Sequence, residues 1–298
     1  MFTGTNIIDF TRRFPDSKSC MQYLEDLKWK KGFSCRRCGE SRWLKGRTSH
    51  HRRCAKCKYD ESPTAHTIFQ DIRMPLIKAF HIIFRLSTKK KGMSSCELAA
   101  EVGVQQKTAW LLRSKLQRAM LNASRNKLEG SVVIDETLIG GERKGYKGRR
   151  HDDKEIAVVA VEQLADGRTG NISLSHTKSF SFDCLNTVIQ NVIDPSAHLS
   201  ADYFTTYRAV KKDRPNTELI VAKGSDFFNE IHKQIMMLKM WLTGIHHKCS
   251  KQHLKNYLRE YEFRFNHRNK RKWIFHNLAC LIPLTEPHPY RDRIRACG

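Results

Sequence analysis

Two pairs of cysteines are the residues of this sequence whose spacing points most directly to a metal ion. Cys35 and Cys38 form one Cys-x2-Cys pair, and Cys54 and Cys57 form a second, with 15 residues between the pairs. This spacing is typical of a four-cysteine zinc ribbon, in which each pair supplies two thiolates to one tetrahedral ion. Because four thiolates leave no open coordination position, we expect a structural Zn²⁺ rather than a catalytic one.

Two alternatives to this interpretation stay open. One is a pair of redox-active dithiols in place of a metal site. The other is that a nearby histidine replaces one cysteine, for which His50, His51 and His66 are the candidates. The six remaining cysteines are scattered along the chain, and we expect them to be reduced thiols that fill the core.

Two aspartates each follow a short apolar run with strand character. Asp135 comes directly after residues 132–134, and Asp202 comes directly after residues 199–201. A carboxylate at a strand end can hold a divalent cation against a phosphate group. A strand-end acid at a turn is also common, so neither aspartate alone defines a site. The two aspartates are 67 positions apart, which leaves room for strands and a helix that bring them together.

The charge of the chain points to a polyanionic partner. The formal net charge is +24, and residues 1–130 contribute 27 basic and 11 acidic side chains to it. Such an excess attracts nucleic acid, although solubility or an anionic membrane surface are alternative uses. No apolar run reaches the ~18 residues of a membrane helix, and the N-terminal segment lacks the features of a secretory signal. We therefore expect a cytoplasmic protein, associated with the nucleoid when bound to DNA, and no membrane partner.

A helix-turn-helix pattern lies between the cysteines and the first aspartate. Ser94 and Glu97 are placed for a capping box, Gly103 supplies the turn, and a second helix starts near residue 105. Polar and basic groups at the front of such a second helix can enter a DNA major groove, although any helical hairpin shares the pattern. The predicted DNA-binding residues of this helix are Gln105, Gln106, Lys107 and Arg113, and the basic cysteine pair adds Arg36 and Arg37.

The spacing of apolar residues predicts helices first and a mixed α/β domain afterwards. Helices are expected within residues 1–30, from 76 to about 88 and within 93–127, and residues 33–69 look loop-like. Strands are expected at 132–134, 156–161, 171–174, 198–201 and 219–221, with a helix over 182–193 and helices from 227 to about 282. Strands followed by helices favour an α/β catalytic domain.

With these motifs in place, the chain resembles the ISXO-type DDE transposases of bacterial insertion sequences. The matching stretches follow the family order and, with the cysteine and helix-turn-helix modules, cover nearly the whole chain: 133–141, 201–207, 229–239, 244–247, 250–254 and 257–268. The resemblance implies a multidomain protein with a zinc ribbon, a helix-turn-helix and a ribonuclease-H-like catalytic domain. The predicted boundaries are 1–72 for the lead-in and zinc ribbon, 73–127 for the helix-turn-helix, 128–285 for the catalytic domain and 286–298 for a tail.

The third metal ligand of the family departs from the usual pattern in this chain. Family members usually have Glu three residues after an Asn, with Lys seven residues beyond, but here Asn229 is followed by His232 and then Lys239. His232 and Lys239 are two helical turns apart and share a face, whereas Glu230 points about 160° away from His232. We therefore expect His232 to take the ligand position, with Glu230 or Asp226 as substitutes.

The resemblance also implies two-metal chemistry. Asp135, Asp202 and His232 are expected to hold Mg²⁺ or Mn²⁺, which activate water and then a 3′-hydroxyl, while Lys239 holds a phosphate or the scissile strand. Because imidazole suits softer ions than carboxylate does, we expect a stronger preference for manganese than in an all-carboxylate relative. A glycine-rich basic loop after the first aspartate adds three predicted DNA contacts, Lys144, Arg149 and Arg150.

The predicted function is that of an insertion-sequence transposase. The expected partners are double-stranded DNA, both as inverted repeats at the element ends and as target, and further copies of the chain that hold two ends together. Two alternatives remain: a DNA-binding regulator whose catalytic domain has decayed, for which His232 is the main argument, and a nuclease of the same fold that cuts but does not join strands.

Overall fold

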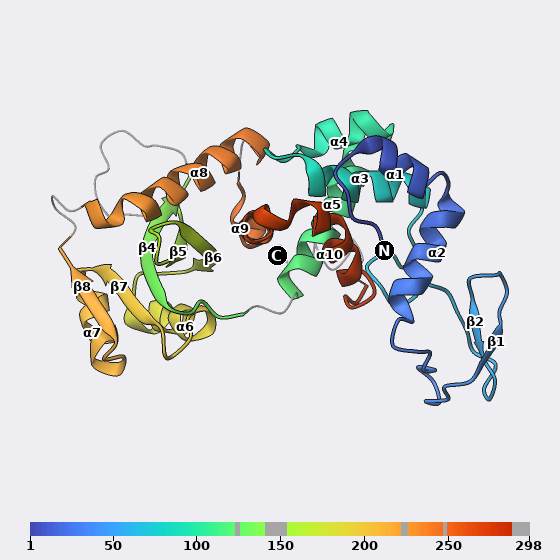
Figure 1. Ribbon diagram of the computed structural model, residues 1–298, viewed down its shortest axis with the longest axis horizontal. Helices are drawn as coiled ribbons and strands as arrows, with labels where there is room; N and C mark the ends of the chain where they lie inside the picture. The colour runs from blue at the N-terminus through green and yellow to red at the C-terminus, as the bar shows by residue number, and fades with distance from the viewer. Residues whose placement is uncertain (123–125, 141–153, 222–225, 247–248, 288–298) are drawn as a thin grey trace. The chain divides into compact units, whose positions relative to one another are not determined.

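The computed structural model describes residues 1–122, 126–140, 154–221, 226–246 and 249–287, and it divides into two compact units (Figure 1). The first unit combines Met1–Ala123 with Asn269–Gly298, and the second is Ser124–Arg268. The second unit is thus inserted between two segments of the first. The predicted catalytic domain, 128–285, extends past this division, because residues 269–285 belong to the first unit.

The first unit is built mainly from helices. In chain order these are α1 (Ile7–Arg13), α2 (Ser17–Lys28), α3 (Leu76–Thr88), α4 (Ser95–Val102), α5 (Gln106–Asn122) and, from the far end of the chain, α10 (Ile274–Leu281). Helix α10 packs against α3, α5 and α2. The centre is aromatic, and its rings include Phe2, Phe10, Phe14, Tyr23, Phe80, Phe84 and Phe275.

Three short strands interrupt the region that the sequence predicted to be loop-like. They are β1 (Trp43–Lys45), β2 (Arg52–Cys54) and β3 (Asp60–Glu61), and they form an antiparallel sheet in the order β1-β2-β3. Strands of two or three residues leave too little alternation for a sequence pattern to reveal them. The small sheet places Cys54 at the end of β2, next to the turn that carries Cys57.

The second unit has a five-stranded mixed sheet. Its strands are β4 (Ser131–Ile139), β5 (Glu155–Gln163), β6 (Thr169–Thr177), β7 (His198–Asp202) and β8 (Thr217–Ile220), in the order β6-β5-β4-β7-β8. The first three strands form an antiparallel meander, whereas β7 and β8 run parallel to β4. This is the mixed sheet of a ribonuclease-H-like layout, as the sequence predicted.

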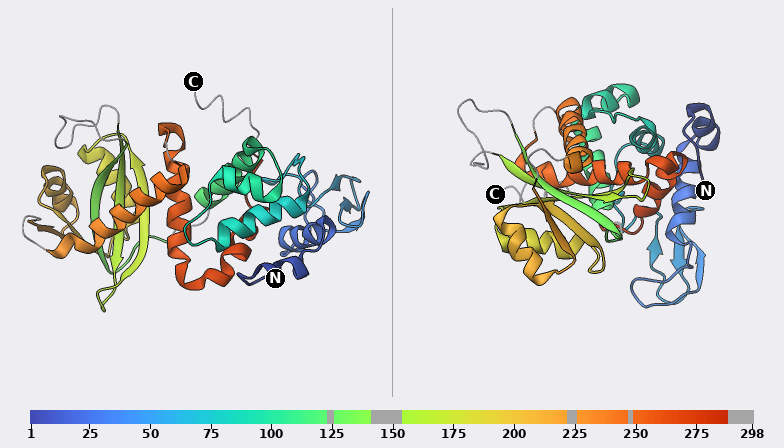
Figure 2. Two further views of the ribbon diagram at one scale, coloured as in Figure 1. Left: turned by 90° about the horizontal axis from the view of Figure 1, so that it is seen from above. Right: turned by 60° about the vertical axis from the view of Figure 1, so that its left-hand side comes forward.

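Helices cover both faces of this sheet (Figures 1 and 2). Helices α6 (Phe182–Val192) and α7 (Thr205–Asp213) bury one face, together with side chains such as Val132 and Ile134. The other face, which includes Val133, is buried by α8 (Asn229–His246) and α9 (Lys251–Asn266). The turns η1 (Asp226–Phe228) and η2 (Arg268–Trp273) precede α8 and α10. Helix α7 was not predicted, because its pattern is short and mostly polar.

Helix α9 covers the free edge of β6 with hydrogen bonds from its side chains. The Asn266 side chain accepts from the Ile172 amide and donates to the Ile172 carbonyl, both at 2.9 Å. One turn earlier, Glu262 accepts from the Leu174 amide at 2.9 Å, and Arg268 donates to the carbonyl of Gly170 at 2.9 Å. An edge strand otherwise exposes unpaired backbone groups, so these bonds complete the sheet.

None of the helices in the described part of the chain is long and apolar enough to cross a membrane.

Candidate active site and metal centres

The two cysteine pairs form matching turns in the first unit. In the first turn, Gly39 donates its amide to the Cys35 carbonyl at 2.8 Å, and its φ is +73°. In the second, Lys58 donates to the Cys54 carbonyl at 3.2 Å with a φ of +60°. The residue after each pair thus reverses the chain in the left-handed region. This geometry turns both cysteines of a pair toward the same point.

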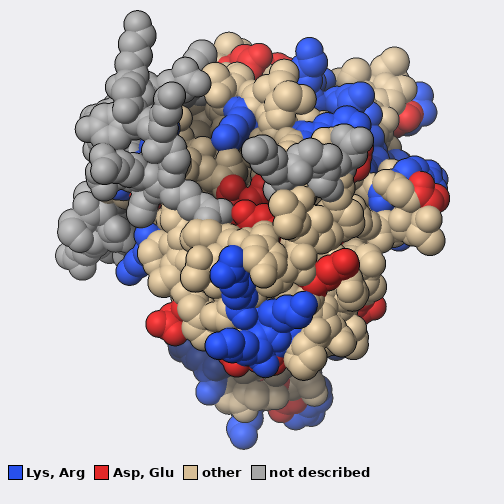
Figure 3. Space-filling view, turned by 90° about the vertical axis from the view of Figure 1, so that its left-hand side faces the viewer, with Lys and Arg blue, Asp and Glu red and all other residues tan. Residues whose placement is uncertain are grey.

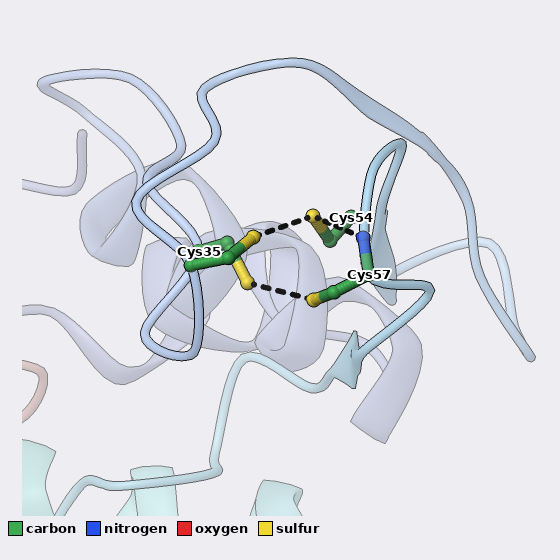
Figure 4. Close-up of side chains that lie close together, drawn as sticks. Cys35, Cys54 and Cys57 are labelled. Carbon is green, nitrogen blue, oxygen red and sulfur yellow. Dashed lines mark hydrogen bonds between the residues drawn. The ribbon is translucent and has the colours of Figure 1, made fainter.

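The four thiols fit a single metal ion. Their Sγ atoms all lie within 4.8 Å of one another, and the Cys35–Cys57 and Cys38–Cys54 distances are both 3.5 Å (Figure 4). A tetrahedral zinc site with bonds of about 2.3 Å needs thiolates at roughly this separation. The donor set therefore matches the structural zinc that the sequence predicted.

The nearby histidines are bound elsewhere. Nδ1 of His50 lies 3.0 Å from Glu25, Nδ1 of His51 lies 2.6 Å from Thr48, and Nε2 of His66 lies 2.8 Å from the Tyr59 hydroxyl. None of them belongs to the group of cysteine ligand atoms. The structure thus offers four cysteines, without a histidine, for the ion.

Asp135 and Asp202 lie at equivalent positions on neighbouring parallel strands. The last pair of the β4–β7 ladder is Val133 with Ser200, and each aspartate is two residues further along its strand. Side chains two residues apart in a strand share a face. Val133 lies in the core under α8 and α9, so Asp135 faces that side of the sheet.

The same alternation places Asp202. Its neighbours Leu199 and Ala201 lie in the core under α6 and α7, so Ser200 and Asp202 face the opposite side. Both carboxylates therefore project toward the layer that contains α8. The register thus places side by side two acids that are 67 residues apart in sequence. Asp202 ends β7 as predicted, whereas Asp135 lies within β4, because this strand continues to Ile139 in its pairing with β5.

His232, on the first turn of α8, completes this group on one side. Its Nε2 lies 3.3 Å from Oδ2 of Asp135. The imidazole is 58% exposed, whereas Asp135 is 19% exposed, so the histidine approaches the carboxylate from solvent. The buried face of the helix consists of Ile231, Ile235 and Leu238. His232 thus occupies the place from which a third ligand would reach the site.

The three side chains are not close enough to share one ion as they stand. In the described part of the chain, the cysteines form the only group of three or more such residues whose ligand atoms all lie within 4.8 Å. A two-metal site is wider than this, because its ions lie about 3.5–4 Å apart and one carboxylate can contact both. The contact of His232 with Asp135, on a strand that pairs with the strand of Asp202, suits that wider kind of site.

Glu136 points to the other face of the sheet and binds Tyr207 of α7. The Tyr207 hydroxyl, which is fully buried, donates to the Glu136 carboxylate. Burial raises the pKa of Tyr207 well above its usual value, and the charge of Glu136 acts in the same direction. Tyr207 therefore stays protonated and holds α7 against the strand that carries Asp135. The sequence assigned no role to Tyr207, and its only signal was its place in the stretch 201–207.

Lys239 lies near the same carboxylate, two turns after His232. Partial burial lowers its pKa, as does the positive charge of Lys154, whereas the charge of Asp135 opposes the shift. Its ammonium group is thus under the influence of both the acid and a second cation. A cation this close to Asp135 suits an anionic substrate such as a phosphate group.

Glu230 lies on another side of α8. It accepts from Lys233 at 3.1 Å, and the Thr169 hydroxyl donates to it at 3.5 Å. Thr169 belongs to β6, at the opposite edge of the sheet from β7. The structure therefore directs Glu230 away from Asp135, and the side chain of Asp226, the other substitute, lies outside the described residues.

Two family models match the chain. The ISXO2-like transposase domain matches residues 127–266, which contain all four residues of the candidate active site, and the transposase zinc-ribbon domain matches residues 15–60. The chain thus carries an ISXO2-like transposase domain together with a transposase zinc ribbon. No curated protein matches it closely enough to be counted.

One solved structure similar to this transposase is the crystal structure of a pre-cleavage Mos1 transpososome. The identity is 13% over 66% of this chain and 76% of that chain, and the TM-score is 0.27. At this score the likeness carries no argument about the site.

The predicted helix-turn-helix of the transposase corresponds to α4 and α5. Ser94 and Glu97 form the capping box, and Gly103 ends α4 with a φ of 62°. Gln105, Gln106 and Lys107 are exposed at the start of α5, and the Gln106 side chain donates to Ser95 at 2.8 Å. The structure thus presents three of the four predicted DNA-binding residues of this helix to solvent.

Arg113 differs from this prediction. Its side chain is 3% exposed and donates to the Met93 carbonyl at 2.6 Å, so it braces the start of the helical hairpin. Periodicity assigned Arg113 to the outer face of α5, but this part of the helix is covered within the unit, where α10 packs against α5. The outward-facing position predicted for Arg113 was wrong for this reason.

The remaining predicted DNA contacts fall in two places. Arg36 and Arg37 are exposed beside the cysteines, where Arg36 lies 3.8 Å from Glu61 and the Arg37 guanidinium lies 4.4 Å from the centre of the Tyr59 ring. Lys144, Arg149 and Arg150 lie outside the described residues.

Proposed function

We propose that this chain is an insertion-sequence transposase that binds the inverted repeats at the ends of its element and catalyses metal-dependent cleavage and transfer of DNA strands. The observation that carries the proposal is the alignment of Asp135 and Asp202 on parallel strands, with His232 at 3.3 Å from Asp135. These residues lie within the matched transposase domain.

Asp135, Asp202 and His232 would hold Mg²⁺ or Mn²⁺. When bound, two such ions activate the attacking oxygen and stabilise charge on the leaving oxygen during in-line displacement at phosphorus. The protein's own contribution is to fix the ligands. Asp135 lies on a strand that is hydrogen-bonded on both sides, and Asp202 lies at the end of the neighbouring strand.

Two further groups would assist the reaction, Lys239 by binding the substrate strand and Tyr207 by fixing the protein around the ligands. Lys239 lies on the same helix face as His232, so its ammonium group can bind a phosphate of the strand held at the carboxylates. Tyr207, through its bond to Glu136, keeps α7 and β4 together. The ligands are thereby held in place before the DNA arrives, and pre-organised charge of this kind is a major source of catalysis.

DNA recognition would involve the first unit. Gln105, Gln106 and Lys107 would enter the major groove, and Arg36 and Arg37, next to a structural Zn²⁺ held by the four cysteines, would contact the backbone. Since two element ends are joined to one target, we expect the active form to be an oligomer. Acting on DNA, the protein would work in the cytoplasm at the nucleoid.

The test is a cleavage and joining assay on DNA that carries the ends of the source element, with Mg²⁺ or Mn²⁺. We expect metal-dependent cleaved and joined products with the wild type, and no products with Asp135→Asn, which keeps the side-chain shape but removes the charge. The Asp166→Asn variant, in the exposed β5–β6 hairpin, is a matched control that makes the same change and keeps all three proposed metal ligands.

A second candidate function is DNA-binding regulation by a chain that no longer cuts. The observation that favours it is the imidazole of His232 where relatives have a carboxylate. In that case the wild type would bind the element ends without cleavage in either metal. Cleaved but never joined products would instead indicate a nuclease of the same fold.

A further inference from the structure

Several exposed apolar side chains lie on or directly after the elements that carry Asp202 and His232. Six of the large apolar side chains that are exposed in the described chain belong to the second unit. One of the six, Leu164, lies in the β5–β6 hairpin. The other five follow the ends of β7 and β8 or lie on α8, and they are Tyr203, Val221, Met236, Met237 and Met240.

Tyr203 is the member of this group nearest to a carboxylate in the chain. It follows Asp202 directly, so the two Cα atoms are about 3.8 Å apart. Its side chain is 53% exposed. The guanidinium carbon of Arg208, from the first part of α7, lies 4.3 Å from the centre of the Tyr203 ring. One face of the ring is thus backed by a cation, and the residue as a whole is exposed to solvent.

The turn that carries Tyr203 is well fixed. Phe204 accepts the amides of Tyr207 at 3.0 Å and Arg208 at 3.3 Å, and the Thr206 hydroxyl donates to the Phe180 carbonyl at 2.9 Å. Tyr207 is buried and bound to Glu136 of β4. The exposed ring therefore stands on a turn that is bonded to the strand of Asp135.

The surrounding charge indicates what the ring binds. Arg208, Lys211 and Lys212 are exposed on α7, with Asp213 as its only acid. In the space-filling view, acidic side chains lie in a hollow with basic side chains above and below (Figure 3). An aromatic ring stacked on an arginine, next to a helix that carries further cations, suits a nucleotide, whose base stacks on the ring while its phosphate meets a cation.

We propose that Tyr203, backed by Arg208, is a stacking platform for an unpaired nucleobase next to the phosphate held at the carboxylates. This inference rests on the proposed function, since it assumes that the carboxylates act on DNA. It adds that the DNA is distorted at the reacting position, with one base outside the duplex stack. Tyr203 is accordingly a positioning residue, because its ring contacts a base rather than the reacting phosphate.

The test compares DNA with and without that base. Affinity for element-end DNA is measured for Asp135→Asn, in which the DNA stays uncut, and for Asp135→Asn combined with Tyr203→Ala. The affinity of each protein is measured for intact DNA and for DNA that contains one abasic nucleotide. In a series of substrates the abasic nucleotide replaces either the terminal nucleotide of the element or one of its neighbours. A 2-aminopurine at the same position reports stacking by loss of its fluorescence.

We expect Tyr203→Ala to weaken binding to intact DNA about tenfold, in line with base–aromatic stacking. At one position the abasic nucleotide should abolish the difference in affinity between the proteins with Tyr203 and with Tyr203→Ala. A 2-aminopurine at that position should lose fluorescence on binding to the protein with Tyr203 but not on binding to the Tyr203→Ala variant. Tyr203→Phe should behave as the tyrosine does. Arg208→Ala should reduce the base dependence, whereas Lys212→Ala, which removes the same charge from α7, should weaken binding equally at all positions.

Two results would overturn the inference. One is an equal loss of affinity for intact and abasic DNA at every position, which would make the ring a structural or general contact. The other is an oligomer that dissociates on Tyr203→Ala with no base dependence, which would make it a protein contact. Failure of the proposed function is separate, since it is the absence of metal-dependent cleavage by a wild type that still binds the DNA.

Discussion

At the scale of single residues, the site differs from an all-carboxylate one by the imidazole of His232. A carboxylate prefers hard ions such as Mg²⁺, whereas imidazole has more affinity for softer ions. The contact with Asp135 at 3.3 Å shows that the side chain reaches the site. The choice of histidine therefore bears on which metal the enzyme uses.

The first prediction concerns that choice. His232→Glu should raise Mg²⁺-supported cleavage relative to Mn²⁺-supported cleavage severalfold, because it replaces a nitrogen ligand with an oxygen ligand. The measurement is the ratio of initial cleavage rates in the two metals for both proteins. Glu230→Gln, on the other side of the helix, is the control and should leave the ratio unchanged. An unchanged ratio of cleavage rates in His232→Glu would show that the histidine does not determine the metal preference.

The second prediction concerns Tyr207. Tyr207→Phe removes the hydroxyl that donates to Glu136 inside the protein and should lower the free energy of unfolding by about 1–3 kcal/mol. The rate of cleavage should also fall, because β4 carries Asp135 and α7 begins three residues after Asp202. Urea unfolding and initial rates measure the two effects. Tyr203→Phe, which removes an exposed hydroxyl from the same turn, is the matched control, and an equal effect of both changes would argue against the role of the buried bond.

At the scale of elements, α9 completes the sheet rather than contacting the active site. Glu262 and Asn266 are one turn apart, and they bind the amides of Leu174 and Ile172, two residues apart on β6. One helical turn rises 5.4 Å and two strand residues rise about 6.6 Å, so the two spacings nearly match. This explains structurally why the stretch 257–268 carries polar residues at these places.

The third prediction tests this cover. Asn266→Ala removes two hydrogen bonds to Ile172 and should cost about 1–3 kcal/mol of stability, since each bond contributes about 0.5–1.5 kcal/mol. The uncovered edge should also increase aggregation. Urea unfolding and light scattering on heating are the measurements. Asn269→Ala, in the exposed turn that follows, should change stability by less than about 0.5 kcal/mol. Equal behaviour of the two variants would contradict the edge-covering role.

At the scale of the whole molecule, the first unit is assembled from both ends of the chain. Phe275 of α10 is fully buried, and its ring contacts Phe2, Phe14 and Phe80 at centroid distances of 5.3–5.9 Å. The amide of Gly4 also donates to the Lys272 carbonyl at 2.9 Å. The unit that carries the helix-turn-helix therefore depends on residues that follow the transposase domain.

The fourth prediction follows from this arrangement. Phe275→Ala should destabilise the first unit by about 3–5 kcal/mol, because it leaves a cavity among aromatic rings. DNA binding through the helix-turn-helix should fall at temperatures where this unit melts, although Phe275 contacts no DNA. Calorimetry and binding measured against temperature provide the check. Leu284→Ala, at a side chain that is 77% exposed, is the control. Binding and melting that match the wild type would show that α10 is dispensable.

The sequence by itself determined the features that depend on a few consecutive residues. Two Cys-x2-Cys pairs were enough to predict the cysteine cluster, because each pair is a single turn. Asp135 and Asp202 were chosen because each acid follows an apolar run, which marked a strand end correctly for Asp202 but not for Asp135, since β4 continues to Ile139. The relation of His232 to Lys239 followed from helical geometry alone.

Only the tertiary structure decided which distant segments meet. The register of β4 and β7 aligns the two aspartates, and the packing of α8 brings His232 to Asp135. Arg113 is buried within the helical unit, and the Tyr203–Arg208 stack depends on a helix that the sequence did not predict. The physical reason is that periodicity gives the face of an element but not the partner that covers it, since the partner is selected by the packing of the whole chain.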